Sequence, residues 1–289
     1  MKALVFGHGG QVATELRRHA RRQGIILEAL DRSQVDLYNP AACAEAVRGT
    51  NAEVIINAAA YTAVDQAEDE PELAQLANGD APGAMAQASA ECGLPFLHLS
   101  TDYVFDGSGE APRSEADPTG PLGVYGRTKL DGERQIAETG GWYAVLRTSW
   151  VFSSHGKNFV KTILRLAETH DRLTVVADQI GGPTPAADIA EALLLIAAKA
   201  RTTEGGILHY SGAPSVSWAD FAREVVSQAG LTAQIEDIPT VDYPTPAKRP
   251  SNSRLDCSLI KDIYGISQPN WQTGLTQVLA DLEVAGARF

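Results

Sequence analysis

The chain opens with a short apolar run that leads directly into a glycine-rich turn, and this junction constrains the fold more than any other feature. Residues 3–6 have the composition of a buried strand, and the segment Gly7-x-x-Gly10-x-x-Ala13 follows at once. Glycine permits the sharp bend from strand to helix and lets the backbone approach a pyrophosphate closely. The free N–H groups at the start of the next helix favour phosphate charge. The junction therefore predicts a strand, a turn and a helix that bind a dinucleotide.

Further apolar runs of strand length alternate with alanine-rich segments of helix length, such as 72–92. Continuous apolar strands are buried on both faces, which is typical of a parallel sheet covered by helices. The alternation predicts an α/β fold: a Rossmann-like, doubly wound parallel sheet with right-handed crossovers. The predicted strands are residues 3–6, 25–30, 54–57, 95–100, 143–147 and 173–176.

The pattern changes beyond about residue 200, where prolines and polar residues accumulate and short helices are predicted over 217–229 and 272–283. This part predicts a smaller C-terminal substrate lobe near the carboxyl ends of the strands, where ligands of open α/β sheets bind. We assign residues 1–149 and 173–200 to a dinucleotide-binding domain. Residues 150–172 and 201–289 are assigned to the lobe.

Tyr125 and Lys129 lie four residues apart, and Thr101 ends a strand-like run before them. Residues i and i+4 share one face of a helix. A free tyrosine has a pKa of about 10, and a neighbouring ammonium lowers it by stabilising the phenolate. Thr101 would orient a carbonyl oxygen toward Tyr125, and Lys129 would also hold a nicotinamide ribose. These three residues predict a nicotinamide-dependent enzyme that delivers a hydride and a proton to a carbonyl.

The ends of the second and third predicted strands add cofactor contacts. Asp31 is placed to bind a ribose 2′-hydroxyl, which favours NAD(H), whereas Arg32 can meet a 2′-phosphate, which favours NADP(H). The sequence leaves this choice open. The predicted cofactor-binding residues are Gly7, Gly10, Gln11, Val12, Asp31, Arg32, Asp36, Leu37, Ala58, Ala59, Ala60, Tyr125 and Lys129.

Charge and cysteine usage exclude several classes of protein. The formal net charge of −12 argues against a nucleic-acid partner, which requires a basic face. The three cysteines lie far apart and form no zinc or disulfide pattern. A strand is predicted from the first residues, and no apolar run is long enough to span a bilayer. We therefore expect a cytoplasmic enzyme without a membrane partner.

In several stretches the chain resembles the extended short-chain dehydrogenase/reductases and, within them, the dTDP-4-dehydrorhamnose reductase family. The resemblance runs over nearly the whole chain. The similar stretches are residues 6–12 (FGHGGQV), 57–65 (NAAAYTAVD), 100–105 (STDYVF), 147–152 (RTSWVF), 178–184 (DQIGGPT) and 249–253 (RPSNS).

The resemblance implies an NAD(P)H-dependent reduction of the C4 ketone of dTDP-4-dehydro-6-deoxy-L-mannose to dTDP-L-rhamnose, the last step of dTDP-L-rhamnose synthesis. It further implies that Phe159 and Lys161 lie near the diphosphate or the base. The substrate-binding residues that it implies are Thr101, Asp102, Trp150, Asn158 and Arg249.

Some members of this family carry a divalent cation at a dimer contact, so the resemblance allows a homodimer and a Mg²⁺ site. The carboxylates that would hold the metal are Glu15, Asp188 and Asp281, although aspartate is shorter than the glutamate expected there. Two other functions stay open. One is a related dTDP-deoxysugar 4-ketoreductase of secondary metabolism. The other is a noncatalytic regulatory subunit on the same fold, which the complete Thr/Tyr/Lys set argues against.

Overall fold

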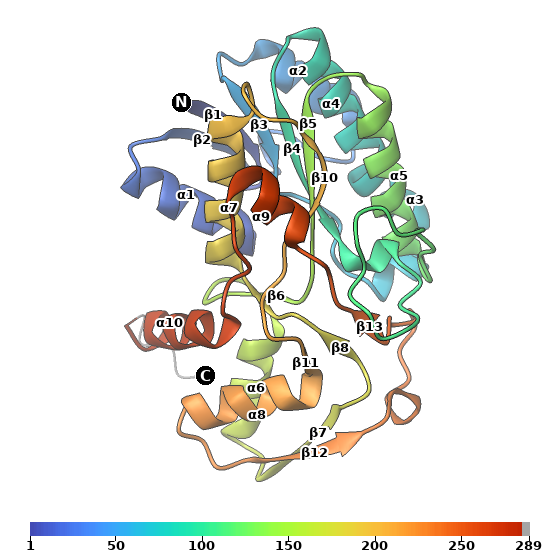
Figure 1. Cartoon of the computed structure of the whole chain (residues 1–289), viewed down its shortest axis with the longest axis vertical. Helices are drawn as coiled ribbons and strands as arrows, with labels where there is room; N and C mark the ends of the chain where they lie inside the picture. The colour runs from blue at the N-terminus through green and yellow to red at the C-terminus, as the bar shows by residue number, and fades with distance from the viewer. Residues whose placement is uncertain (285–289) are drawn as a thin grey trace.

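A six-stranded sheet forms the centre of the larger part of the molecule (Figure 1). The computed structural model describes residues 1–284. Every strand pairing in this sheet is parallel, and the strand order is β10-β5-β4-β3-β1-β2. The predicted doubly wound parallel sheet is therefore confirmed. Its strands are β1 (Lys2–Phe6), β2 (Ile26–Leu30), β3 (Val54–Asn57), β4 (Phe96–Thr101), β5 (Tyr143–Thr148) and β10 (Gly206–His209).

Helices cover both faces of this sheet, as the side chains of β1 illustrate. Successive strand residues point to opposite faces. Ala3 and Val5 accordingly join one buried cluster, while Leu4 and Phe6 join another. The first face is covered by α1 (Gln11–Arg22), α7 (Ala186–Lys199) and α9 (Ser258–Tyr264). The second is covered by α2 (Pro40–Gly49), α4 (Ala81–Glu91) and α5 (Val124–Glu138).

The helix predicted over 72–92 is interrupted. It consists of α3 (Pro71–Gln75), a π-helical turn (Leu76–Asp80) and α4. Such turns insert one residue into a helix and change which side chains face inward. Here the turn buries Asn78 completely.

A smaller lobe lies below the carboxyl ends of the strands in Figure 1. Its own hydrophobic core includes Phe152, Ile163, Phe221 and Leu275. The helices predicted over 217–229 and 272–283 are present as α8 and α10. The main elements are α6 (Phe159–Ala167), β7 (Arg172–Val176), α8 (Trp218–Gln228), β12 (Gln234–Ile238) and α10 (Trp271–Val284). The short strands are β6 (Val151–Phe152), β8 (Ile180–Gly181), β9 (Thr184–Pro185), β11 (Val216–Ser217) and β13 (Asn252–Ser253).

Two strands lie where the sequence interpretation did not place them. Residues 173–176 were expected in the central sheet, but β7 pairs with β12 in the smaller lobe. The sixth central strand is instead β10, which pairs with β5 although it falls within the range 201–289 assigned to the lobe. β10 is only four residues long and begins at a glycine, so its apolar signal is weak.

The strand register brings the functional turns to one edge of the sheet. Phe6 pairs with Asn57, Asn57 pairs with His98, and Thr101 pairs with Thr148. The glycine turn and the segments after β3 and β4 therefore meet at the edge that faces the smaller lobe.

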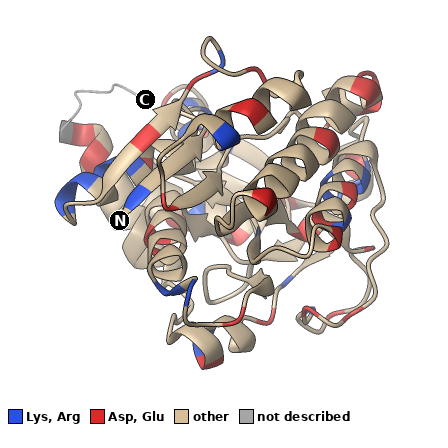
Figure 2. Cartoon of the chain, turned by 90° about the horizontal axis from the view of Figure 1, so that it is seen from above, with Lys and Arg blue, Asp and Glu red and all other residues tan. Residues whose placement is uncertain are grey.

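Charged residues are spread over the surface of the described chain. Figure 2 shows that acidic and basic residues occur along the helices around the sheet, with acidic residues on several of them. The formal net charge of the full sequence is −12. Among residues 1–284, none of the helices has both the length and the apolar character that a membrane crossing requires.

Candidate active site

A cleft of about 760 Å³ runs along the carboxyl edge of the sheet. The glycine turn, the ends of β2, β3 and β4, the start of α5 and the segment around Trp150 form its walls. All the predicted cofactor residues line this cleft, together with Thr101 and Asp102. Asn158 and Arg249 are not among its lining residues, and neither are the three carboxylates predicted to hold a metal.

The glycine turn packs closely against the segment after β3. Gly7 has a φ of +112°, and a Cβ there would lie 3.4 Å from the carbonyl carbon and oxygen of Ala58. A side chain would therefore be strained by the backbone conformation itself. No Cβ contact within 4 Å restricts Gly10, which immediately precedes α1. This open turn before a helix N-terminus suits the diphosphate of a dinucleotide.

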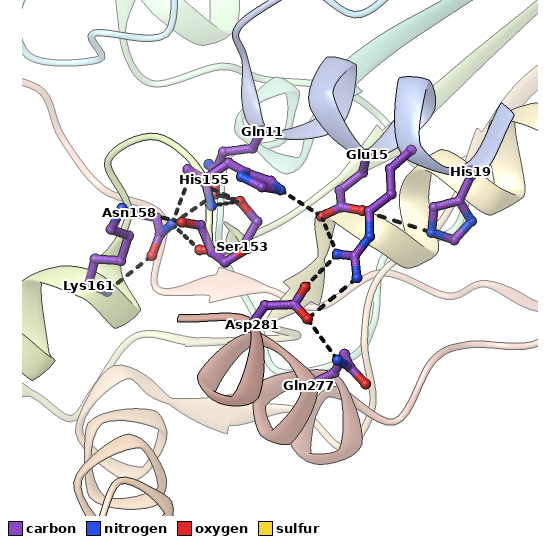
Figure 3. Close-up of polar contacts among 11 residues, drawn as sticks. Gln11, Glu15, His19, Ser153, His155, Asn158, Lys161, Gln277 and Asp281 are labelled. Atoms are coloured by element: carbon purple, nitrogen blue, oxygen red, sulfur yellow. Dashed lines mark hydrogen bonds and ion pairs between the residues drawn. The ribbon is translucent and has the colours of Figure 1, made fainter. Parts of the chain in front are cut away.

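Gln11 links the glycine turn to the smaller lobe. Its Oε1 accepts hydrogen bonds from Ser153 Oγ and Asn158 Nδ2, each at 3.0 Å (Figure 3). Asn158 also caps α6, since its Oδ1 accepts from the backbone N–H of Lys161 at 3.2 Å. The Asn158 side chain therefore connects the glycine turn to α6 of the smaller lobe. Its predicted contact with the substrate is not seen in the cleft lining.

Asp31 and Arg32 line the part of the cleft that follows β2. Oδ1 of Asp31 accepts from the N–H and hydroxyl of Ser33 at 2.8 and 2.6 Å, and these bonds lower the pKa of Asp31. The guanidinium of Arg32 lies 3.3 Å from Asp36 and 4.8 Å from the centre of the Tyr38 ring. Both residues line the cleft and lie next to each other in the chain.

Thr101 and Tyr125 face the inner end of the cleft. Thr101 Oγ1 accepts from the N–H of Tyr103 at 3.2 Å, which fixes the hydroxyl at the end of β4. The Tyr125 ring meets Tyr103 edge-on, with 5.5 Å between ring centres. Burial raises the pKa of Tyr125 above its ordinary value. The phenol therefore holds its proton at neutral pH, as a proton donor must.

Lys129 lines the cleft and has two polar contacts on β4. Its Nζ donates to the carbonyl oxygen of Leu99 at 2.6 Å and lies 2.9 Å from His98 Nε2. Burial lowers the pKa of Lys129 to about 7, and Glu133 opposes that shift. The sequence predicted that this ammonium would lower the pKa of Tyr125, yet burial dominates and raises it. Sequence reasoning missed His98, whose only signal is its place three residues before Thr101 on β4.

Trp150 forms the wall of the cleft that the smaller lobe contributes. Its φ of +50° is rare for a residue with a large side chain, and such strain is concentrated at functional sites. The indole stacks on Trp218 with 3.6 Å between ring centres, and a Cβ on Gly181 would come within 2.7 Å of it. Trp218 was not predicted as part of the site.

Asp102 is buried beside Thr101. Its Oδ1 accepts from the Thr101 hydroxyl at 3.0 Å, whereas its Oδ2 has no hydrogen-bond partner in the described structure. Burial raises the pKa of Asp102 to about 6. An unpaired buried carboxylate oxygen is costly, so it is a natural acceptor for a ligand hydroxyl.

Arg249 lies next to the cleft and is held by Asp65. Its Nη2 donates to Asp65 Oδ2 at 2.6 Å, and Asp65 Oδ1 accepts from the N–H of Ala247 at 3.1 Å. The Nη1 group of Arg249 is buried without a hydrogen-bond partner in the described structure. One side of the guanidinium is therefore fixed by Asp65, and the arginine also lies close to Tyr103, where it opposes the rise in the pKa of that phenol caused by burial.

The three carboxylates predicted to bind a metal are Glu15, Asp188 and Asp281, and two of them have cationic partners within this chain. Glu15 is buried and lies 3.1 Å from His155 Nε2 (Figure 3). Its carboxylate is also 3.6 Å from Arg18. Asp281 pairs with Arg18. Within residues 1–284, no group of three or more acidic, histidine or cysteine side chains has the arrangement of a metal site. Arg18 supplies positive charge beside Glu15 and Asp281 within this chain, and the metal at a dimer contact stays a prediction.

The fold and the cleft define the class of protein. A parallel dinucleotide-binding sheet with a tyrosine and a lysine at its carboxyl edge is that of an oxidoreductase with a nicotinamide cofactor. Sequence comparison then places the chain within that class. It belongs to the family described as "RmlD substrate binding domain", whose profile matches residues 1–284.

Individual relatives match over their full length. The dTDP-4-dehydrorhamnose reductase of Sinorhizobium fredii is 44% identical over 99% of each chain, and that of Escherichia coli K12 is 40% identical over 98% of each. A solved dTDP-4-dehydrorhamnose reductase from Clostridium acetobutylicum has a TM-score of 0.93 at 33% identity, and covers 98% of this chain and 100% of that one. The Bacillus anthracis reductase, solved in complex with NADP, has a TM-score of 0.91 at 31% identity, with 97% and 99% covered.

Proposed function

We propose that this chain is a dTDP-4-dehydrorhamnose reductase. It uses NAD(P)H to reduce the C4 ketone of dTDP-4-dehydro-6-deoxy-L-mannose to dTDP-L-rhamnose, the last step of dTDP-L-rhamnose synthesis. The observation that carries the proposal is that Thr101, Tyr125 and Lys129 line one cleft with the glycine turn. Full-length relatives at 44% and 40% identity bear the same activity in their names.

Three residues of the cleft are proposed to have distinct roles in the reaction. The cleft residues from the glycine turn to Ala60 would hold a nicotinamide cofactor, which would supply the hydride that C4 receives. Tyr125 donates its proton to the ketone oxygen and is afterwards reprotonated from solvent, so that one proton is consumed in each turnover. Thr101 donates a hydrogen bond to the same oxygen and orients it toward the phenol. Lys129 lies one helical turn from Tyr125 and supplies the nearby positive charge when it is protonated.

The sugar nucleotide is proposed to bind between Trp150 and the end of β4. Asp102 offers a free carboxylate oxygen to a sugar hydroxyl. The fixed guanidinium of Arg249 directs its free donors toward the diphosphate, in keeping with the planar fork of arginine. Under this proposal the smaller lobe binds the sugar nucleotide and the sheet domain binds the cofactor.

Both nicotinamide cofactors are proposed to be used, since Asp31 favours NADH and Arg32 favours NADPH. We predict that Arg32→Ala raises the KM for NADPH by roughly tenfold, because a charge-assisted hydrogen bond contributes about 1.5–3 kcal/mol. The KM for NADH should change much less. Steady-state assays with each cofactor measure the difference. Equal losses with both would show that Arg32 does not contact the 2′-phosphate.

The activity is tested with purified protein, dTDP-4-dehydro-6-deoxy-L-mannose and NADPH. We expect the absorbance of the reduced cofactor to fall and dTDP-L-rhamnose to form, as identified by chromatography against a standard. Formation of the C4 epimer, dTDP-6-deoxy-L-talose, would instead indicate a related deoxysugar reductase. If no cofactor is oxidised although dTDP and NADPH both bind, the chain is a noncatalytic member of the fold.

Assembly and location follow from the family resemblance and stay predictions. The family resemblance allows a homodimer, and sedimentation analysis of the purified chain measures its mass in solution. A cytoplasmic location is expected for an enzyme whose cofactor and nucleotide-sugar substrate are cytoplasmic metabolites, and fractionation of cells that produce the protein tests it.

A further inference from the structure

Three buried polar side chains form a row behind the cleft. Asn57 ends β3, His98 lies on β4, and Lys129 lies on α5. Asn57 Nδ2 is 3.1 Å from His98 Nδ1, and His98 Nε2 is 2.9 Å from Lys129 Nζ. None of the three is more than 1% exposed. Of the three, only Lys129 lines the cleft.

The orientation of the Asn57 amide is fixed by the backbone. Its Oδ1 accepts from the N–H of Ala59 at 3.1 Å, so its Nδ2 faces His98. Rotating the amide would place its NH₂ group against the N–H of Ala59. An amide NH₂ can only donate, so Nδ1 of His98 must accept.

This donor fixes the tautomer of His98. Burial, and secondarily Lys129, lower the pKa of His98 well below its ordinary value, so the ring is neutral. A neutral imidazole whose Nδ1 accepts carries its proton on Nε2. That N–H points at the nitrogen of Lys129 and requires a lone pair there. An ammonium has none, whereas a free amine has one and can still donate to the carbonyl of Leu99.

We propose that Asn57 and His98 are positioning residues that hold Lys129 as the free amine in the cofactor-free protein. The proposal deepens the proposed function and rests on it for the place of Lys129 in the reaction. The direction of the hydrogen bonds, from Asn57 to His98 to Lys129, is a property of the protein alone. A lysine ammonium stabilises a nearby phenolate. Asn57 and His98 therefore set the pH below which Lys129 is protonated and can stabilise the phenolate of Tyr125.

The other charged groups around Lys129 do not reverse this arrangement. Tyr125 and Glu133 face it from its own helix, and burial keeps Tyr125 neutral. Glu133 favours the ammonium, but Arg147 of β5 already pairs with it through contacts of 2.6 and 3.0 Å. The hydroxyl of Ser100 on β4 bonds the same carboxylate. β3 contributes only the uncharged Asn57.

The first test measures the tautomer directly in cofactor-free protein. Nitrogen NMR of ¹⁵N-histidine protein distinguishes a ring nitrogen that carries a proton from one that does not, and His98→Gln identifies the signals of His98. We expect His98 to be neutral with its proton on Nε2 at about pH 8–9, where Lys129, whose pKa is lowered to about 7, is a free amine. A proton on Nδ1, or an imidazolium within that range, would overturn the proposal.

The second test reverses the direction of the hydrogen bonds. Asn57→Asp keeps the acceptor for Ala59 but accepts from His98 Nδ1, so that Nε2 becomes an acceptor and favours the ammonium. We expect the titration midpoint of Lys129 to rise by roughly 1–3 pH units. The ¹³Cε signals of labelled lysines report it, and Lys129→Met identifies the signal.

Asn78→Asp is the matched control. Asn78 is another fully buried amide, and its side chain bonds Tyr61 and Thr128 rather than His98. The midpoint of Lys129 should stay in place in that variant. An unmoved midpoint in Asn57→Asp, or an equal shift in both variants, would refute the proposal.

If Asn57→Asp does not fold, the tautomer measured in the unmodified protein decides alone. That measurement needs no substrate, so its failure is distinguishable from a failure of the reductase assay.

Discussion

At the residue scale, the site depends on which side chains hold protons. Burial keeps Tyr125 protonated at neutral pH. We predict that Tyr125→Phe lowers kcat by roughly 10²–10⁴-fold, the usual contribution of a positioned acid. Affinity for NADPH should stay near that of the unmodified enzyme, because the ring remains. Steady-state kinetics and cofactor titration measure both quantities, and a loss of less than about tenfold would remove Tyr125 as the donor.

The buried Lys129 makes stability depend on pH. Its pKa is lowered to about 7 in the folded chain, against about 10.4 when unfolded. Between these values the unfolded state binds more protons, so stability rises with pH. We predict that the unmodified protein gains up to about 1.4 kcal/mol per pH unit relative to Lys129→Met over this window. Urea unfolding at about pH 7 and about pH 9 tests this. Parallel pH dependences would contradict the lowered pKa.

At the scale of elements, the first turn of α5 is held against the end of β4 by a glycine. A Cβ on Gly126 would lie 2.2 Å from the carbonyl oxygen of Tyr103, which is backbone and cannot rotate away. We predict that Gly126→Ala displaces Tyr125 from Thr101 and lowers kcat/KM by roughly 100-fold, because small misplacements at a reacting centre are costly. Gly49→Ala is the control. Gly49 is the last residue of α2, and a Cβ added there would have no neighbouring atom within 4 Å. Activity should therefore be retained.

At the scale of the whole molecule, the cleft exists because two lobes are held in one orientation. Arg18 on α1 pairs with Asp281 on α10 and lies 3.6 Å from the buried Glu15. We predict that Arg18→Met destabilises the protein by about 1–3 kcal/mol, since it leaves a buried carboxylate with one partner fewer. Arg223→Met is the matched control. Its exposed ion pairs lie within the smaller lobe, so the loss should stay below about 1 kcal/mol. Urea unfolding compares the two, and equal losses would show that the contact between the lobes adds nothing.

Much of the fold and the site can be predicted because the signals are local. The glycine turn requires backbone conformations that only a residue without a side chain adopts freely, and the apolar runs of β1, β3 and β4 admit burial on both faces. A parallel sheet then brings their carboxyl ends to one edge, so Thr101 and the segment after Asn57 had to meet there. The helical spacing of Tyr125 and Lys129 is equally local.

Other features were decided only by the tertiary structure, because they depend on partners distant in the sequence. The short strand β10 is stabilised by β5, and β7 pairs with β12 rather than with the central sheet. Long charged side chains have many rotamers, so their direction is set by what surrounds them. Lys129 turns to His98, and Arg249 turns to Asp65. The sequence by itself determined where the chemistry lies along the chain, whereas tertiary packing decided which polar groups face one another and in which protonation state.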